Sequence, residues 1–68
     1  MAASHLSYLL RQKFVATDKI PRAMNNVRAQ EYLKLRGPLT GAEMIASGHW
    51  RIPYDIKYFA EKRFIRKV

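Results

Sequence analysis

Aromatic rings and cations alternate between residues 48 and 59, and this segment has the residue types best suited to chemistry. Its rings and cations are His49, Trp50, Arg51, Tyr54, Lys57, Tyr58 and Phe59. Flat rings beside cations suit the unstacked bases and phosphates of a nucleic acid. We expect Arg51 and Lys57 to contact phosphates or an acidic partner. Trp50 and Phe59 are instead expected to close a small core.

The C-terminal stretch combines an apolar stripe with a basic face. If residues 56–67 form one helix, Ile56, Ala60 and Phe64 share a side, which is the spacing of a helix packed on one face. The cations of the opposite side are Lys57, Lys62, Arg63, Arg66 and Lys67. We expect four of them, Lys57, Arg63, Arg66 and Lys67, to contact phosphates. A basic amphipathic helix of this kind can also lie on a membrane surface.

Catalysis needs convergent groups, and the sequence offers none. The acids occur singly, as Asp18, Glu31, Glu43, Asp55 and Glu61. No glycine pattern matches a phosphate-cradling loop, and cysteine is absent. The two histidines, His5 and His49, are far apart, so a metal site would need further ligands from the scattered acids. We therefore expect no enzymatic activity, no cofactor and no metal.

The overall composition points to one small domain, residues 1–68, with an anionic partner. The chain carries 13 Lys and Arg against 5 Asp and Glu, a net charge of +8. An excess of this sign favours nucleic-acid phosphates or an anionic surface. A short chain without disulfides or a metal has little core of its own, so we expect little or no independent core and no stable free monomer. No apolar run approaches the length of about 20 residues that a membrane span needs.

The pattern of caps and breakers predicts an all-α fold of three or four short helices joined by Pro and Gly turns. The first is expected at residues 4–16 and the second at 26–36, where Gly37 and Pro38 end it. Thr40 and Glu43 form a capping box that opens a helix of about two turns before Gly48. The irregular aromatic segment follows, and Asp55 is expected to cap the last helix.

The first 17 residues contain cations and hydroxyl groups and no acid. This composition is typical of mitochondrial and chloroplast transit peptides. We therefore expect residues 1–17 to be a candidate organellar targeting helix that has not been removed.

Three motifs between residues 25 and 55 carry a resemblance to a known family. They are Asn26-Val27-Arg28, Leu33-Lys34-Leu35-Arg36-Gly37-Pro38 and Trp50-Arg51-Ile52-Pro53-Tyr54-Asp55. On these motifs the chain resembles the mitochondria-specific ribosomal proteins of the small subunit that are numbered thirty-three. This chain has a longer gap between Gly-Pro and the aromatic-Pro pair, and it lacks the family's Lys-rich tail. The resemblance implies a building block of the mitochondrial ribosome, with Arg28, Lys34 and Arg36 at matching basic positions.

Two other classes stay open. A small matrix-side accessory subunit of a respiratory-chain complex would also be short, basic and free of disulfides. A helix-turn-helix DNA-binding protein would account for a capped short helix, a Gly turn and a second helix within residues 40–59, although Pro53 interrupts the turn.

The sequence thus predicts a structural constituent of the ribosome in the mitochondrial matrix, which binds rRNA and neighbouring subunits and takes no small-molecule substrate. The residues expected to bind nucleic acid are Arg28, Lys34, Arg36, Arg51, Lys57, Arg63, Arg66 and Lys67.

Overall fold

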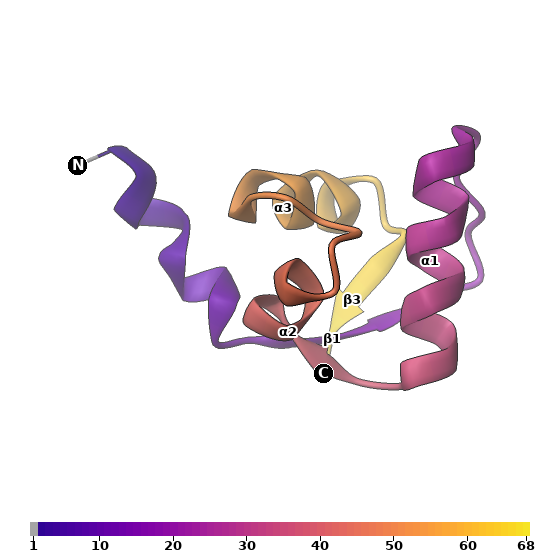
Figure 1. The fold of residues 1–68 in the computed structure, drawn as a ribbon, viewed down its shortest axis with the longest axis horizontal. Coiled ribbons are helices and arrows are strands. Elements are labelled where there is room, and N and C mark those ends of the chain that lie inside the picture. Colours follow the sequence, from indigo (N-terminus) through magenta and orange to yellow (C-terminus); the bar gives the residue numbers. More distant parts are fainter. Residues whose placement is uncertain (1) are drawn as a thin grey trace.

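The fold mixes helices with a small sheet (Figure 1). The computed structural model describes residues 2–68, and the side chains from Leu6 onward. The elements in chain order are the 3-10 helix η1 (Ala2–Leu10), β1 (Lys13–Ala16), α1 (Met24–Arg36), β2 (Leu39–Thr40), α2 (Gly41–Ala46), α3 (Pro53–Glu61) and β3 (Ile65–Lys67). In Figure 1, η1 and α1 lie at opposite ends of the molecule, with α2 and α3 between them.

The three strands form one antiparallel sheet in the order β2-β1-β3. In the middle strand, Phe14 lies opposite Leu39 of β2 and Lys67 of β3. The expected all-α class is therefore wrong. These strands have two to four residues, too few to leave a clear alternating pattern, and their pairing joins segments far apart in the chain.

The N-terminal segment does not continue as one helix over residues 4–16. The 3-10 helix ends at Leu10, and β1 begins at Lys13. Aromatic and β-branched residues such as Phe14 and Val15 fit a strand better than a helix. Leu6, Leu9 and Phe14 are nevertheless buried.

The C-terminal helix is shorter than expected and begins earlier. It starts at Pro53, and Asp55 lies within its first turn, where the carboxylate Oδ2 accepts hydrogen bonds from the N–H groups of Arg51 (2.8 Å) and Ile52 (3.4 Å). The helix ends at Glu61, and Arg63 takes a left-handed φ of 65° before the chain enters β3. The predicted helix over 56–67, with a shared basic face for its last cations, is therefore wrong.

Local helix signals are confirmed where capping groups decide the backbone. Helix α1 ends at Arg36, and the N–H of Gly37 (φ 76°) donates to the carbonyl of Leu33 at 3.0 Å. The capping box opens α2, with the Thr40 N–H donating to Glu43 Oε1 (2.9 Å) and the Glu43 N–H donating to Thr40 Oγ1 (3.1 Å).

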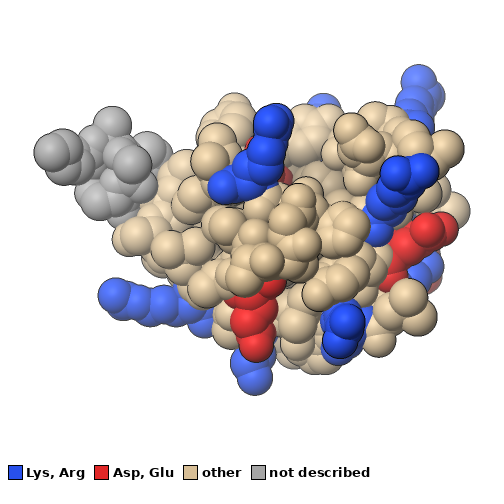
Figure 2. Space-filling model, viewed as in Figure 1, with Lys and Arg blue, Asp and Glu red and all other residues tan. Residues whose placement is uncertain are grey.

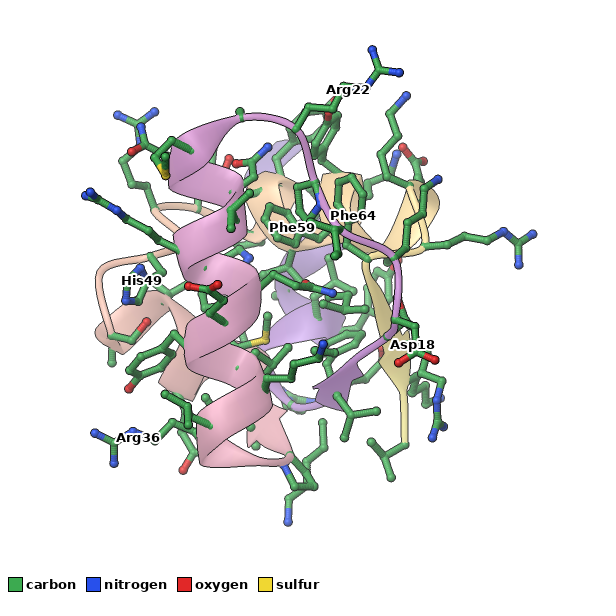
Figure 3. The ribbon with its side chains drawn as sticks, turned by 90° about the vertical axis from the view of Figure 1, so that its right-hand side faces the viewer. Asp18, Arg22, Arg36, His49, Phe59 and Phe64 are labelled. Carbon is green, nitrogen blue, oxygen red and sulfur yellow. The ribbon has the colours of Figure 1, made fainter. Side chains whose placement is uncertain are left out.

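A continuous apolar core fills the space between the helices and the sheet, which corrects the expectation of little or no independent core. Its residues are Leu6, Leu9, Phe14, Ala29, Leu33, Met44, Trp50, Ile56, Phe59, Phe64 and Ile65. The rings of Trp50 and Phe59 pack edge to face with their centres 5.6 Å apart, and the rings of Phe59 and Phe64 do the same with their centres 5.5 Å apart. Figure 3 shows Phe59 and Phe64 next to each other, to the right of α1. The core roles predicted for Trp50 and Phe59 are thus confirmed.

Candidate nucleic-acid interface

One open groove brings together two of the predicted basic residues, Arg28 and Arg51. We call it the arginine groove, and its volume is about 640 Å³. It is lined by Asn25, Asn26, Arg28, Gly48, His49, Arg51, Asp55, Tyr58 and Phe59. The lining comes from the first half of α1, from the segment between α2 and α3, and from α3 itself. Tertiary folding therefore assembles this groove from segments that lie far apart in the chain.

Neighbouring residues fix the position of the backbone that carries each arginine. Arg28 immediately precedes Ala29, which faces the core, so the Arg28 side chain projects from the exposed part of α1. Arg51 follows the fully buried Trp50, and its N–H is held by the Asp55 carboxylate. The segment that carries Arg51 is thus anchored at both sides, while its guanidinium remains exposed.

Aromatic groups complete the arginine groove. Tyr58 is 40% exposed, and Phe59 forms part of the lining from its buried position. The His49 ring lies 4.6 Å from the ring of Tyr32, which fixes the flank of the groove next to α1. Figure 3 shows His49 beside the middle of that helix. The ammonium group of Lys62 lies 5.7 Å from the centre of the Tyr58 ring. A groove lined by cations and by a partly exposed ring can bind a phosphate and stack a base.

A second groove, of about 490 Å³, is lined by three further residues of the predicted set, Arg63, Arg66 and Lys67. We call it the strand-edge groove, and its lining is Tyr8, Leu9, Gln12, Phe14, Thr17, Ala60, Arg63, Ile65, Arg66 and Lys67. No acid is among these residues. Arg66 and Lys67 are adjacent in a strand, so their side chains leave β3 on opposite faces rather than along one helical face.

The other three predicted binding residues lie in neither groove. Lys57 Nζ forms an ion pair with Glu61 Oε2 at 2.7 Å, and this hydrogen bond raises the pKa of Lys57. The guanidinium of Arg36 lies 5.4 Å from the centre of the Tyr32 ring. Lys34 is exposed near the end of α1. The structure therefore separates the eight predicted residues into two grooves and three isolated positions.

Several groove residues were missing from the sequence-based set. Asn25 and Asn26 belong to α1 and line the arginine groove, although paired asparagines are typical of turns and caps. Tyr8 lines the strand-edge groove at 50% exposure. No local pattern in the sequence marks these positions, because their role depends on elements that pack beside them.

Charge is spread widely over the surface. Figure 2 shows Lys and Arg side chains at separate places on one face and acids in only a few places. Within the described part of the chain, no three His, Cys, Asp or Glu side chains gather as metal ligands. His5 lies outside the described side chains. Among residues 2–68, no helix has the length and apolar character that crossing a membrane requires.

Comparison of the chain with protein-family models, with curated proteins and with solved structures gives no match. The resemblance to the mitochondrial ribosomal proteins therefore stays a prediction from the three sequence motifs.

Proposed function

We propose that this protein is a structural RNA-binding component of a ribonucleoprotein assembly and that the arginine groove is its main RNA contact. The observation that carries the proposal is the meeting of Arg28 and Arg51 around one open groove with the exposed ring of Tyr58. The net charge of +8 adds a long-range attraction for polyanions.

The groove favours an unpaired nucleotide over a duplex. Its lining is concave and contains both rings and side-chain amides, which can stack and hydrogen-bond a base only when that base is unstacked. The Asp55 carboxylate also lines the groove, but it already accepts hydrogen bonds from two main-chain N–H groups. It therefore repels a phosphate less than a free carboxylate would.

Among ribonucleoproteins, we propose the mitochondrial ribosome as the assembly, with rRNA and neighbouring subunits as partners in the matrix. The support is the resemblance over residues 25–55, in which Arg28 and Arg51 both lie within matching motifs. The acid-free composition of residues 1–17 agrees with an organellar destination.

Salt-dependent RNA binding tests the role of the groove. A labelled single-stranded oligoribonucleotide is titrated with the wild-type chain and with the double variant Arg28→Ala and Arg51→Ala, at several salt concentrations. Each lost phosphate contact flattens the log–log salt slope by about 0.7 for a single strand. We expect the double variant to flatten it by roughly 1–2 units.

A control variant with the same loss of charge separates the effect of the groove residues from the effect of net charge. The double variant Arg11→Ala and Arg22→Ala removes two exposed cations that line neither groove. It should change the slope clearly less than the groove variant. Equal slopes for the two variants would mean that RNA is attracted by overall charge, and the proposal for this groove would fail.

Cell fractionation tests which assembly contains the protein. We expect the protein to sediment with mitochondrial ribosomal subunits at low salt and to leave them at high salt. Retention in the detergent-extracted membrane fraction with a respiratory complex would favour the accessory-subunit alternative instead.

A further inference from the structure

Helix α3 carries a second accessible ring just outside the arginine groove. Tyr54 is 56% exposed and does not line the groove, whereas Tyr58 is 40% exposed and does. The two residues are four positions apart in α3, so they lie on one face of the helix with their Cβ atoms about 5–6 Å apart. The aromatic surface of the groove therefore continues for one more turn of the helix.

A lysine ammonium group lies over each of these two rings. Lys57 Nζ is 5.6 Å from the centre of the Tyr54 ring, and Lys62 Nζ is 5.7 Å from the centre of the Tyr58 ring. The ion pair with Glu61 also contacts the ammonium group of Lys57, at 2.7 Å. A ring that already has a partner in the free protein loses less conformational freedom when a ligand stacks on it.

The charges around the two rings favour an anionic ligand. Both acids of α3 already have partners, because Asp55 accepts main-chain hydrogen bonds and Glu61 pairs with Lys57. The cations of Arg28 and Arg51 lie in the adjoining groove. A single-stranded nucleic acid matches this surface, because each of its nucleotides has a flat base to stack on a ring and a phosphate to meet a cation.

We propose that Tyr54 and Tyr58 form a tyrosine platform, on which two neighbouring bases of a single-stranded RNA stack while its backbone passes into the arginine groove. Successive nucleotides of a stacked strand are about 3.4 Å apart, which is less than the separation of the two residues. A duplex therefore cannot use both rings. Since every base has a flat face, the platform selects unstacked single strands without selecting a sequence. The inference rests on the proposed function and adds Tyr54 to the RNA contact.

Affinity and salt slope together test the tyrosine platform. A fluorescein-labelled oligouridylate is titrated with the wild-type chain and with Tyr54→Leu, and binding is followed by anisotropy at several salt concentrations. We expect Tyr54→Leu to weaken binding at least about fivefold, because one base loses its ring. The salt slope should stay unchanged, because no cation is removed.

Two control variants separate stacking from other effects of the substitution. Tyr54→Phe keeps the ring and should bind within about twofold of the wild-type chain. Tyr8→Leu removes a ring of similar exposure, 50%, that belongs to η1 and lies outside the tyrosine platform. Its affinity should also stay within about twofold of wild type. Equal affinities of Tyr54→Leu and Tyr54→Phe, or an equal loss in Tyr8→Leu, would overturn the proposal.

NMR of the tyrosine ring protons shows where the bases lie. On addition of oligouridylate we expect the ring signals of both Tyr54 and Tyr58 to move upfield, because a stacked base shields the ring. Fixed Tyr54 signals contradict the proposal, as does a duplex that binds as tightly as the single strand. A glutamate-rich peptide that shifts these signals when RNA does not would assign the surface to an acidic protein instead.

The two RNA proposals can fail separately. If Tyr54→Leu has no effect while the double variant Arg28→Ala and Arg51→Ala still flattens the salt slope, the tyrosine platform is wrong and the arginine groove remains the RNA contact. If the wild-type chain does not bind the oligonucleotide at all, both proposals are wrong.

Discussion

The side-chain amide nitrogen of Gln30 donates a hydrogen bond to the main-chain carbonyl of Phe64, which links the middle of α1 to the entry of β3. Gln30 is buried, with 4% of its surface exposed. The same nitrogen lies 3.2 Å from each of the carbonyls of Thr17 and Lys19. One side chain thus connects α1 to both segments that flank the β1–β3 ladder.

Replacing Gln30 with methionine tests this link. The substitution keeps the length of the side chain but removes the donor, so buried carbonyl groups lose a partner. We expect the free energy of unfolding to fall by about 0.5–1.5 kcal/mol, as measured by urea denaturation, because the Phe64 carbonyl keeps its hydrogen bond from the Thr17 N–H. Glu31→Met, at the exposed neighbouring position, serves as the control and should change stability by less than about 0.5 kcal/mol. Equal effects of the two changes would show that the Gln30 hydrogen bonds add no net stability.

Gly41 brings the start of α2 into direct contact with the backbone of η1. A Cβ at this position would overlap the carbonyl oxygen of Leu9 and lie 2.8 Å from its carbonyl carbon, and the Gly41 N–H already donates to the carbonyl of Gln12 at 2.9 Å. We expect Gly41→Ala to destabilise the fold by about 3 kcal/mol or more, because backbone atoms would have to move apart.

Gly48→Ala is the matched comparison for Gly41→Ala. Gly48 has a φ of 89°, and a methyl group added there would have nothing within 4 Å, so only backbone conformation opposes the change. Its cost should be about 1–2 kcal/mol. Thermal melts followed by circular dichroism would rank the two variants, and a larger loss for Gly48→Ala would contradict the tight approach of η1 and α2.

The capping box of α2 predicts a pH dependence of stability. The main-chain N–H of Thr40 holds the pKa of Glu43 below its ordinary value of 4.5, with smaller help from the Thr40 side chain and from Lys13. A lowered folded-state pKa stabilises the fold at pH values above 4.5, and this contribution is lost as the pH falls through the folded-state value. We expect Glu43→Gln to reduce the acid-side loss of stability measured by urea denaturation between neutral pH and about pH 3. An unchanged pH profile would mean that this carboxylate does not couple to folding.

The ion pair between Lys57 and Glu61 predicts how Lys57 contributes to RNA binding. Because Glu61 already holds the ammonium group at 2.7 Å, we expect Lys57→Ala to leave the salt slope of RNA association nearly unchanged. Glu61→Gln keeps the side-chain size and frees the ammonium. It should steepen the slope by up to about 0.7 if Lys57 then reaches a phosphate. A marked flattening in Lys57→Ala alone would instead show that RNA displaces Glu61.

Features that depend on near neighbours in the chain could be predicted from the amino-acid sequence. Capping groups act over three or four residues, so the end of α1 at Gly37 and the box from Thr40 to Glu43 could be predicted. The apolar character of Trp50 and Phe59 was likewise enough to place them in the core. The excess of cations was visible as composition and indicated an anionic partner.

The sheet and the two grooves depend on contacts between segments that are far apart in the chain. The pairing of β1 with β3 places Phe14 opposite Lys67. The stability that a strand gains from pairing depends on its partner strand, which the local sequence cannot reveal. The turn at Arg63 connects the end of α3 to β3. Arg63 has a left-handed backbone conformation, which glycine usually adopts, so no glycine in the sequence marks this turn. The same long-range packing brings Arg28 and Arg51 to one groove and places Arg66 in the outer strand β3, because these positions depend on which buried residues meet across the core.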